Sequence, residues 1–255
     1  MKRLFFSAVF VGLTTVSGVC AGVTSINSAV VTTHVFNDVP SAIPIVVNSY
    51  PSAIYLAELG VSRTNGFANR DLWQFSANGT TPYQLQNGDY FSATFNLALT
   101  GSPISPRKEA GFLFSTVNDG DVQFVVNTDG HEVVQFGGIS FYSFTGNNLV
   151  PPYNSGQSVV LRMDYFKDSN GLNALRFFAN GVASPVFDFT STVGSGALDI
   201  GNGSTLGGYF QIQNDPANPA NGGNALFYNI SIIPEPSTLV LLGLGGLALL
   251  LRRRS

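Results

Sequence analysis

The stretch Phe91-Ser92-Ala93-Thr94-Phe95-Asn96-Leu97-Ala98-Leu99 decides the fold of this 255-residue chain. Its apolar side chains recur at every second position, with small or polar residues between them, which is the period of a half-buried strand. The turn dipeptide Asn87-Gly88 stands just before it and marks where the strand begins. We therefore expect a sheet that has one face in a packed core.

Segments of the same kind follow on the C-terminal side, and turn dipeptides join them. These dipeptides are Asp119-Gly120, Asp129-Gly130, Asn170-Gly171 and Asn180-Gly181. The expected strands cover residues 111–117, 122–127, 132–136, 139–144, 159–166, 172–179, 182–189, 207–213 and 225–232. So many strands without a helical pattern require two stacked sheets. The predicted fold class is all-β, a two-sheet β-sandwich of jelly-roll type.

The segment before Phe91 predicts shorter strands. Prolines 40, 44 and 51 interrupt a Val-, Ile- and Thr-rich segment, which favours short edge strands between residues 23 and 50. Residues 52–59 form either a strand or one helical turn, because periodicity does not separate the two over so short a run. Residues 63–83 are loop-like around one strand at 72–75, and we expect its Trp73 in the core.

The alternating strands also predict which side chains meet in the core. We expect one cluster made of Phe91, Phe95, Phe112, Phe114, Leu161 and Phe177. The composition agrees with a strand protein, because the chain has 21 Phe and 28 Gly and is only 11% charged.

The last residues have a different character. Pro234-Glu235-Pro236 precede an apolar run at 237–251 and the arginines Arg252, Arg253 and Arg254. The run is about 22 Å long as a helix and the hydrocarbon core is about 30 Å thick, so it predicts a temporary transmembrane anchor. The arginines should stay on the cytoplasmic side, which places the body on the far side of the membrane.

These three features together resemble the PEP-CTERM sorting signal of bacteria that make exopolysaccharide. The resemblance implies that an exosortase-type membrane enzyme recognises Pro234, Glu235, Pro236 and the arginine cluster and releases the protein outward. An ordinary single-span tether is the alternative, and whether the tail is cleaved or retained stays open.

The first residues predict export by the Sec machinery. Lys2-Arg3, an apolar stretch and Val19-Cys20-Ala21 have the order of a secretory signal peptide with a signal helix. The expected domains are therefore a signal peptide at 1–21, a β-sandwich at 22–233 and the sorting signal at 234–255. The expected location is the cell surface or the extracellular matrix, after transient anchoring in the inner membrane.

The charge of the body argues against nucleic acid as a partner. The chain has 12 Lys and Arg against 15 Asp and Glu, and five of the basic residues lie in the two terminal signals. The mature body is therefore mildly acidic, whereas phosphate contacts need clustered basic residues. Cleavage after Ala21 also removes the only cysteine, so the core must hold the fold without a disulfide.

Residues 90–233 resemble concanavalin A-like and laminin-G-like jelly rolls. The stretches that carry this resemblance are Gly111-Phe112-Leu113-Phe114, Asp129-Gly130, Val159-Val160-Leu161-Arg162 and 175–181, which ends in Asn180-Gly181. The resemblance implies carbohydrate or protein binding, in some members with Ca²⁺. The candidate ligand-binding residues, which flank loops or stand at a hairpin end, are Tyr142, Tyr153, Tyr209 and Asn180. The structural alternative is that the tyrosines cover sheet edges and that Asn180 caps a turn.

Oxygen ligands cluster at two expected hairpin ends. Asp119 and Asp121 are the candidate metal ligands, and Asp164 with Asp168 forms a second group of the kind that Ca²⁺ prefers. Asp and Asn are also ordinary turn residues. We expect no cofactor. Ca²⁺ is the one ion whose binding the sequence leaves open.

No pattern of catalytic residues stands out. The sandwich glucanase run Glu-x-Asp-x-Glu is absent, and none of the four glutamates lies within five residues of another. His131-Glu132 follows a turn, and His34 has no partner nearby in the sequence, which favours a strand surface. We therefore expect a non-enzymatic structural or carbohydrate-binding module. The alternative is a polysaccharide hydrolase or lyase whose carboxylates meet only in the fold.

Overall fold

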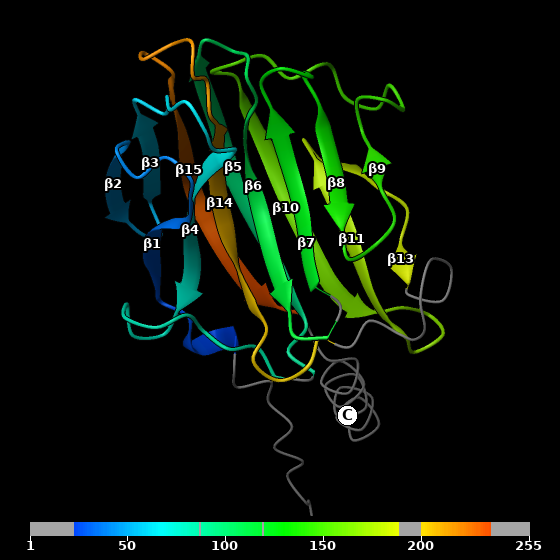
Figure 1. Ribbon diagram of the computed structural model, residues 1–255. Coiled ribbons are helices and arrows are strands. Elements are labelled where there is room, and N and C mark those ends of the chain that lie inside the picture. Colours follow the sequence, from blue (N-terminus) through cyan, green and yellow to red (C-terminus); the bar gives the residue numbers. More distant parts are fainter. Residues whose placement is uncertain (1–22, 87, 119, 189–199, 236–255) are drawn as a thin grey trace, which may run out of the picture.

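Two antiparallel sheets stacked face to face make up the body of the protein (Figure 1). The structure is a computed structural model, and it describes residues 23–86, 88–118, 120–188 and 200–235. The predicted all-β sandwich is confirmed. The expected signal helix and nearly all of the sorting signal lie outside the described residues. Within those ranges, no helix is long and apolar enough to cross a membrane.

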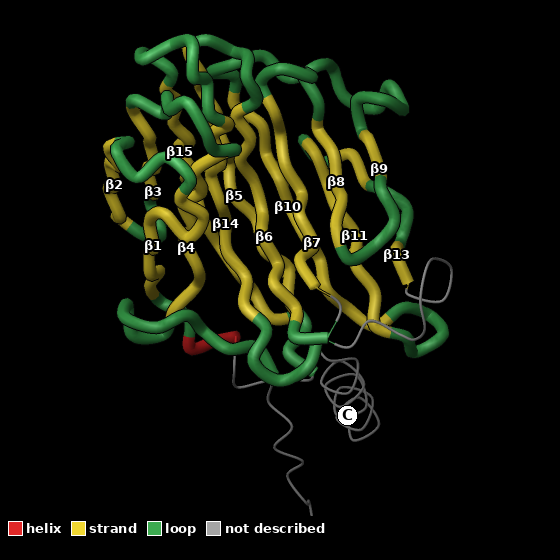
Figure 2. Tube along the Cα trace, in the orientation of Figure 1, coloured by secondary structure: helices red, strands yellow, loops and turns green. Residues whose placement is uncertain are grey.

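The seven-stranded sheet begins at the N-terminal edge strand and ends at a two-residue strand. Its order is β1 (Ser28–Asn37), β4 (Ala68–Ser76), β14 (Thr205–Gln213), β6 (Lys108–Thr116), β7 (Gly120–Asn127), β8 (Val133–Gly137) and β9 (Tyr142–Ser143). Figure 2 shows these strands crossing the body side by side.

The eight-stranded sheet has the strand of the deciding stretch near its centre. Its order is β12 (Val182–Ala183), β11 (Asn173–Ala179), β10 (Ser158–Lys167), β5 (Phe91–Ser102), β15 (Gly222–Pro234), β3 (Ala53–Leu59) and β2 (Ile43–Ser49), and β13 (Phe187–Asp188) also pairs with β11. The short 3-10 helix η1 (Val23–Ser25) precedes both sheets along the chain.

The expected edge position of the strands between residues 23 and 50 is confirmed, because β1 and β2 are each an outermost strand of one sheet. Their expected shortness is not confirmed, since β1 has 10 residues and β2 has 7. Residues 52–59 hold a strand, β3, and the predicted strand at 72–75 is the centre of a longer one, β4. The predicted strand at 182–189 is wrong as one unit. Pro185 lacks an N–H and Ser184 Oγ accepts a bond from the Phe177 N–H, so the chain forms β12 and β13 instead.

One further expectation is corrected. The strand predicted at 139–144 is reduced to β9, because Gly137 and Gly138, with φ of 83° and 29°, turn the chain before it. The last strand, which leads into the sorting signal, is an interior strand. β15 pairs with both β3 and β5, and the Glu235 N–H still donates to Tyr90 O at 3.1 Å.

The core lies between the sheets, and the predicted cluster is confirmed. All six of its members have 0% exposure: Phe91, Phe95, Phe112, Phe114, Leu161 and Phe177. Trp73 is also buried, and it makes edge contacts with Phe75, Phe95 and Phe227 at ring-centroid distances of 5.2, 5.8 and 5.6 Å.

Candidate functional site

Strand β1 carries a bulge that re-aims one of its side chains. Its pairing with β4 runs through Thr32 opposite Leu72 and resumes with Phe36 opposite Arg70, so three residues of β1 face Asp71 alone. The middle one, His34, has φ of 55°, a left-handed conformation that is unfavourable for a residue other than glycine. Bulges and strained residues of this kind concentrate at functional sites.

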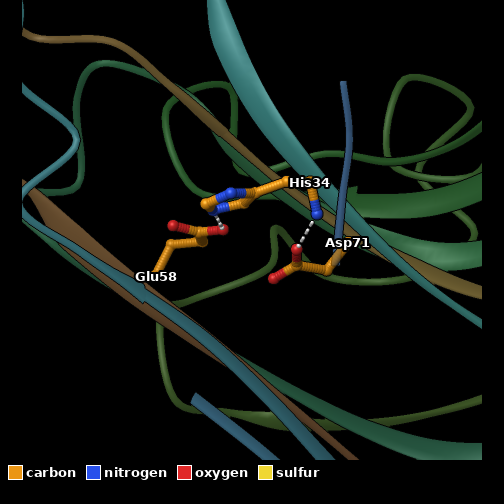
Figure 3. A group of neighbouring side chains, drawn as sticks. All are labelled: His34, Glu58 and Asp71. Atoms are coloured by element: carbon orange, nitrogen blue, oxygen red, sulfur yellow. Dashed lines mark hydrogen bonds and ion pairs between the residues drawn. The ribbon is translucent and has the colours of Figure 1, made fainter. Parts of the chain in front are cut away.

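The bulge brings His34 against two acidic residues from different strands. His34 Nε2 lies 2.7 Å from Glu58 Oε1, and the His34 backbone N–H donates to Asp71 Oδ1 at 2.9 Å (Figure 3). Asp71 is in the inward-facing row of β4 that also holds Trp73, and Glu58 is at the end of β3 in the opposite sheet. The cluster therefore lies between the two sheets.

Both carboxyl groups of this cluster are buried and incompletely satisfied. Glu58 and Asp71 have 0% exposure, while the His34 side chain is 17% exposed. Glu58 Oε2 and Asp71 Oδ2 have no hydrogen-bond partner among the described residues. One ligand atom from each of the three side chains lies within 4.8 Å of the others, so the group has the dimensions of a metal site.

Burial and mutual repulsion dominate the electrostatics of the cluster. Burial and the neighbouring Asp71 carboxylate raise the pKa of Glu58 to about 8, and the Asn69 amide partly offsets this rise. Burial also raises the pKa of Asp71, against the opposing effects of the His34 backbone N–H and imidazole. At neutral pH the pair must therefore share a proton or face a cation.

The sequence did not reveal this cluster, and the prediction that His34 lies on a strand surface is wrong. Its three members come from three strands in two sheets, so no spacing in the sequence connects them. One signal was present. Asp71 continues the alternation of Trp73 and Phe75, which would have placed a carboxylate on the buried face of β4.

A second candidate site covers the outer face of the seven-stranded sheet. Its polar row crosses the strands in register as Arg70, Gln211, Glu109 and Asn127. Arg70 Nε donates to Gln211 Oε1 at 2.8 Å, and Gln211 Nε2 donates to Glu109 Oε1 at 3.0 Å. Glu109 is 5% exposed and Gln211 is 6% exposed, whereas Arg70 is half-buried. The guanidinium is therefore the accessible end of this network.

An apolar strip lies beside the polar row on the same face. It consists of Leu72, Leu113, Val125, Val134, Phe136 and Tyr209, and it is separate from the main core. Two glycines let the backbones approach here, because a Cβ at Gly111 would lie 2.1 Å from Phe124 O and one at Gly207 would lie 1.9 Å from Trp73 O. We call the polar row and the apolar strip together the Arg70 face.

The predicted ligand-binding tyrosines do not share one rim. Tyr153 is 2% exposed, and its hydroxyl donates to Leu99 O at 3.0 Å, so its ring presents no face to a ligand. Tyr209 is 0% exposed under the Arg70 guanidinium, 4.9 Å from its ring centroid, and its hydroxyl donates to Glu109 Oε1 at 3.2 Å. Tyr153 therefore packs in the main core, whereas Tyr209 lies in the Arg70 face beneath the Arg70 side chain.

The other two predicted ligand-binding residues have local structural roles. Tyr142 is half-buried, with edge contacts to Phe144 and Phe187 at 5.1 and 5.9 Å. Asn180 is exposed in a left-handed turn, with φ of 50°, where its Oδ1 accepts from the Val160 N–H at 2.9 Å. Neither joins the Arg70 face.

Within the described residues, the structure does not bring the predicted metal ligands together. Asp119 lies outside the described ranges, and Asp121 is exposed at the start of β7. Asp164 accepts from Ser92 Oγ at 2.7 Å and lies 3.1 Å from Arg162 Nε. Asp168 Oδ1 accepts from the N–H groups of its own turn, which is the structural role of such residues.

His131 and Glu132 are held by separate contacts. His131 Nδ1 lies 2.8 Å from Tyr153 O, and Glu132 Oε2 accepts from Asn127 Nδ2 at 2.8 Å. A further shallow pocket of about 260 Å³ opens on the outer face of the eight-stranded sheet, lined in part by Tyr55, Leu59 and Asn224. It has apolar, hydroxyl and amide side chains but no charged one.

Comparison with known proteins identifies the C-terminal tail and the fold. Residues 233–254 match the PEP-CTERM protein-sorting motif, so the chain is an exported protein with a C-terminal sorting tail. A comparison with curated protein sequences finds no match.

Among solved structures, an alginate lyase from Pseudomonas aeruginosa is similar at 15% identity and a TM-score of 0.52, over 74% of this chain and 85% of that one. The carbohydrate-binding module CBM66 from Bacillus subtilis is similar at 12% identity and a TM-score of 0.40, over 79% and 94%. The carbohydrate recognition domain of Emp47p has 14% identity and a TM-score of 0.39, over 74% and 87%. At such identities the likeness concerns the jelly-roll fold.

Proposed function

We propose that this protein is a non-enzymatic polysaccharide-binding module that an exosortase-type enzyme processes and releases to the cell surface or extracellular matrix. The single observation that carries the binding role is the Arg70 face, where a polar row lies directly beside an apolar strip. Sugar rings have the same two-sided chemistry, because hydroxyl groups surround an apolar ring face. The sorting motif supplies the route to a polysaccharide matrix.

Each part of the Arg70 face has a distinct task in this proposal. The partly exposed Leu72, two residues from Arg70 on β4, would cover the apolar face of a pyranose ring, and Phe136, four strands away on β8, would contact a different ring of the same polymer. Gln211 and Glu109 hold the Arg70 side chain through its Nε, which leaves the outer end of the guanidinium to bind hydroxyl or carboxylate oxygens. An exopolysaccharide in the matrix is the expected ligand.

Binding is tested with a glycan array of the full chain in mild detergent, with and without Ca²⁺. We expect Arg70→Gln to weaken binding about tenfold or more, since a hydrogen bond from a charged group contributes about 1.5 to 3 kcal/mol. Arg176→Gln is the matched control, because Arg176 is a half-buried arginine on the other sheet. Equal affinities of the two variants would contradict the Arg70 face, and Tyr55→Ala then tests the pocket on the eight-stranded sheet.

The alternative is a polysaccharide hydrolase or lyase. The carboxyl pair of Glu58 and Asp71 offers it little support, because both groups have 0% exposure between the sheets, out of reach of a polymer. Tyr209 would be a poor general base, since burial and the Glu109 carboxylate raise its pKa well above the usual value. New reducing ends, or ultraviolet absorbance of an unsaturated product, after incubation with polysaccharides would favour an enzyme over a binding module.

Processing has its own test. We expect the exported form to lack Arg252, Arg253 and Arg254, with a new C-terminus near Pro234. Mass spectrometry of the protein recovered from the cell surface or medium measures this directly. A mature C-terminus that still ends in Arg254-Ser255 would contradict release by an exosortase and favour a permanent tether.

A further inference from the structure

We propose that His34, Glu58 and Asp71 bind one divalent transition-metal ion of the Zn²⁺ type between the two sheets. This site is independent of the Arg70 face and of the proposed polysaccharide binding. It uses side chains from β1, β3 and β4, so an ion there would join the edge strand β1 and its neighbour β4 to β3 of the opposite sheet.

The geometry fits one ion. Zn²⁺ binds imidazole nitrogen and carboxylate oxygen at about 2.0 to 2.2 Å, so two ligands of a tetrahedral ion lie about 3 to 4 Å apart. Here one imidazole nitrogen and two carboxylate oxygens lie within 4.8 Å of one another, with His34 Nε2 and Glu58 Oε1 at 2.7 Å. The 2.7 Å pair would have to open to that separation when an ion enters between the two atoms.

The unsatisfied oxygens point to a cation. Glu58 Oε2 and Asp71 Oδ2 are buried without a hydrogen-bond partner in the described part of the chain, and each such group carries a desolvation cost. Among the described residues, the His34 imidazole is the one basic side chain within 4.0 Å of either carboxyl. A divalent ion would balance both carboxylates and supply the missing partners.

The donor set selects the kind of metal. Imidazole with carboxylate suits Zn²⁺ and its first-row neighbours, whereas Ca²⁺ takes six to eight oxygen ligands. Asn69 adds no oxygen, because its Oδ1 accepts from the Val39 N–H at 2.9 Å. The fourth position would be filled by water on the side of His34, whose side chain is 17% exposed.

Metal binding would explain the strained backbone conformation at His34. The bulge and the φ of 55° turn the imidazole from the edge strand toward Glu58. Strain of this kind persists where the surrounding structure fixes it. A bound ion would fix the imidazole through Nε2, while Asp71 already holds the His34 backbone N–H.

The test measures metal content and optical spectra of the full chain purified in mild detergent without chelators. We expect about one Zn²⁺ per chain by mass spectrometry of the elements, and visible absorption bands when Co²⁺ replaces it. Zn²⁺ at a hundredfold excess over its Kd should raise Tm by roughly 5 to 10 °C. These effects should be lost in Glu58→Gln and Asp71→Asn.

The control uses the other histidine of the chain. His34→Asn should abolish the Co²⁺ bands, while His131→Asn should keep them. Both positions have positive φ, at 55° and 53°, and asparagine tolerates that conformation, so both variants should fold. Folded protein without Co²⁺ bands, a Zn²⁺ effect that persists in His34→Asn, or loss of the bands in His131→Asn would each overturn the proposal. The first result would mean that the carboxyl pair holds only a proton.

Discussion

Replacing Phe95 with alanine is expected to lower the free energy of unfolding by about 3 to 5 kcal/mol. Phe95 is 0% exposed at the centre of the sandwich, where its ring lies 4.1 Å from Phe112, 5.2 Å from Phe227 and 5.8 Å from Trp73. These partners come from both sheets, so the cavity would open between the layers. Denaturant unfolding of the two proteins, followed by Trp73 fluorescence, measures the difference.

Phe141→Ala is the matched control, because the Phe141 side chain is 64% exposed and its loss should change stability by less than about 0.5 kcal/mol. Domains of this kind hold about 5 to 15 kcal/mol in total, so Phe95→Ala could unfold the protein outright. Phe95→Leu then serves as the milder variant, with a smaller cost in the same direction. Equal midpoints for the Phe95 and Phe141 variants would contradict a shared core at Phe95.

The core could be predicted because strand alternation is a local property. Phe91, Phe95 and Phe112 each sit in a run where every second residue is apolar, and a buried face needs only that pattern. The edge position of β2 could also be predicted from a local feature, since a proline such as Pro44 is tolerated where a strand lacks a neighbour.

The candidate sites could not be predicted, because they depend on register between distant strands. Arg70 meets Gln211 only when β4 pairs with β14, and no local pattern encodes that pairing. His34 needs a bulge in β1 to reach Glu58. Tyr153 shows the converse error, because a residue beside a loop was expected on the surface although its ring lies in the main core.

The sequence also did not reveal that Lys108 is buried, because its surroundings depend on the pairing of distant strands. Replacing Lys108 is the second change with a large expected effect on stability. Lys108 faces inward at the start of β6 with 0% exposure. Its stem packs against two glycines, since a Cβ at Gly101 would lie 2.9 Å from Lys108 Cδ and one at Gly223 would lie 3.1 Å from Cγ. Its Nζ donates to Pro103 O at 2.6 Å and to Pro106 O at 2.8 Å. The ammonium is thus buried among carbonyl groups and forms no ion pair with a described carboxylate.

Burial lowers the pKa of Lys108 to about 8, and the charges of Asp215 and Asp129 oppose this shift only in part. In the unfolded chain the same group titrates near its ordinary pKa of 10.5. Between these two pH values the unfolded state binds more protons than the folded state, so the Lys108 contribution to stability increases as pH rises from about 8 to 10.5. The full gain is at most about 3 kcal/mol, because each pKa unit corresponds to about 1.4 kcal/mol.

Lys108→Met removes the charge and keeps the stem, so its stability relative to the wild type should be highest below pH 8 and should fall toward pH 10.5. The quantity to measure is the difference in unfolding free energy between variant and wild type from pH 7 to 10.5, because tyrosines that titrate in this range cancel in that difference. For Lys167→Met, at an exposed lysine, the difference in unfolding free energy from the wild type should not change with pH. If the difference for Lys108→Met is also independent of pH, the Lys108 ammonium is solvated and its burial between the sheets does not govern its charge.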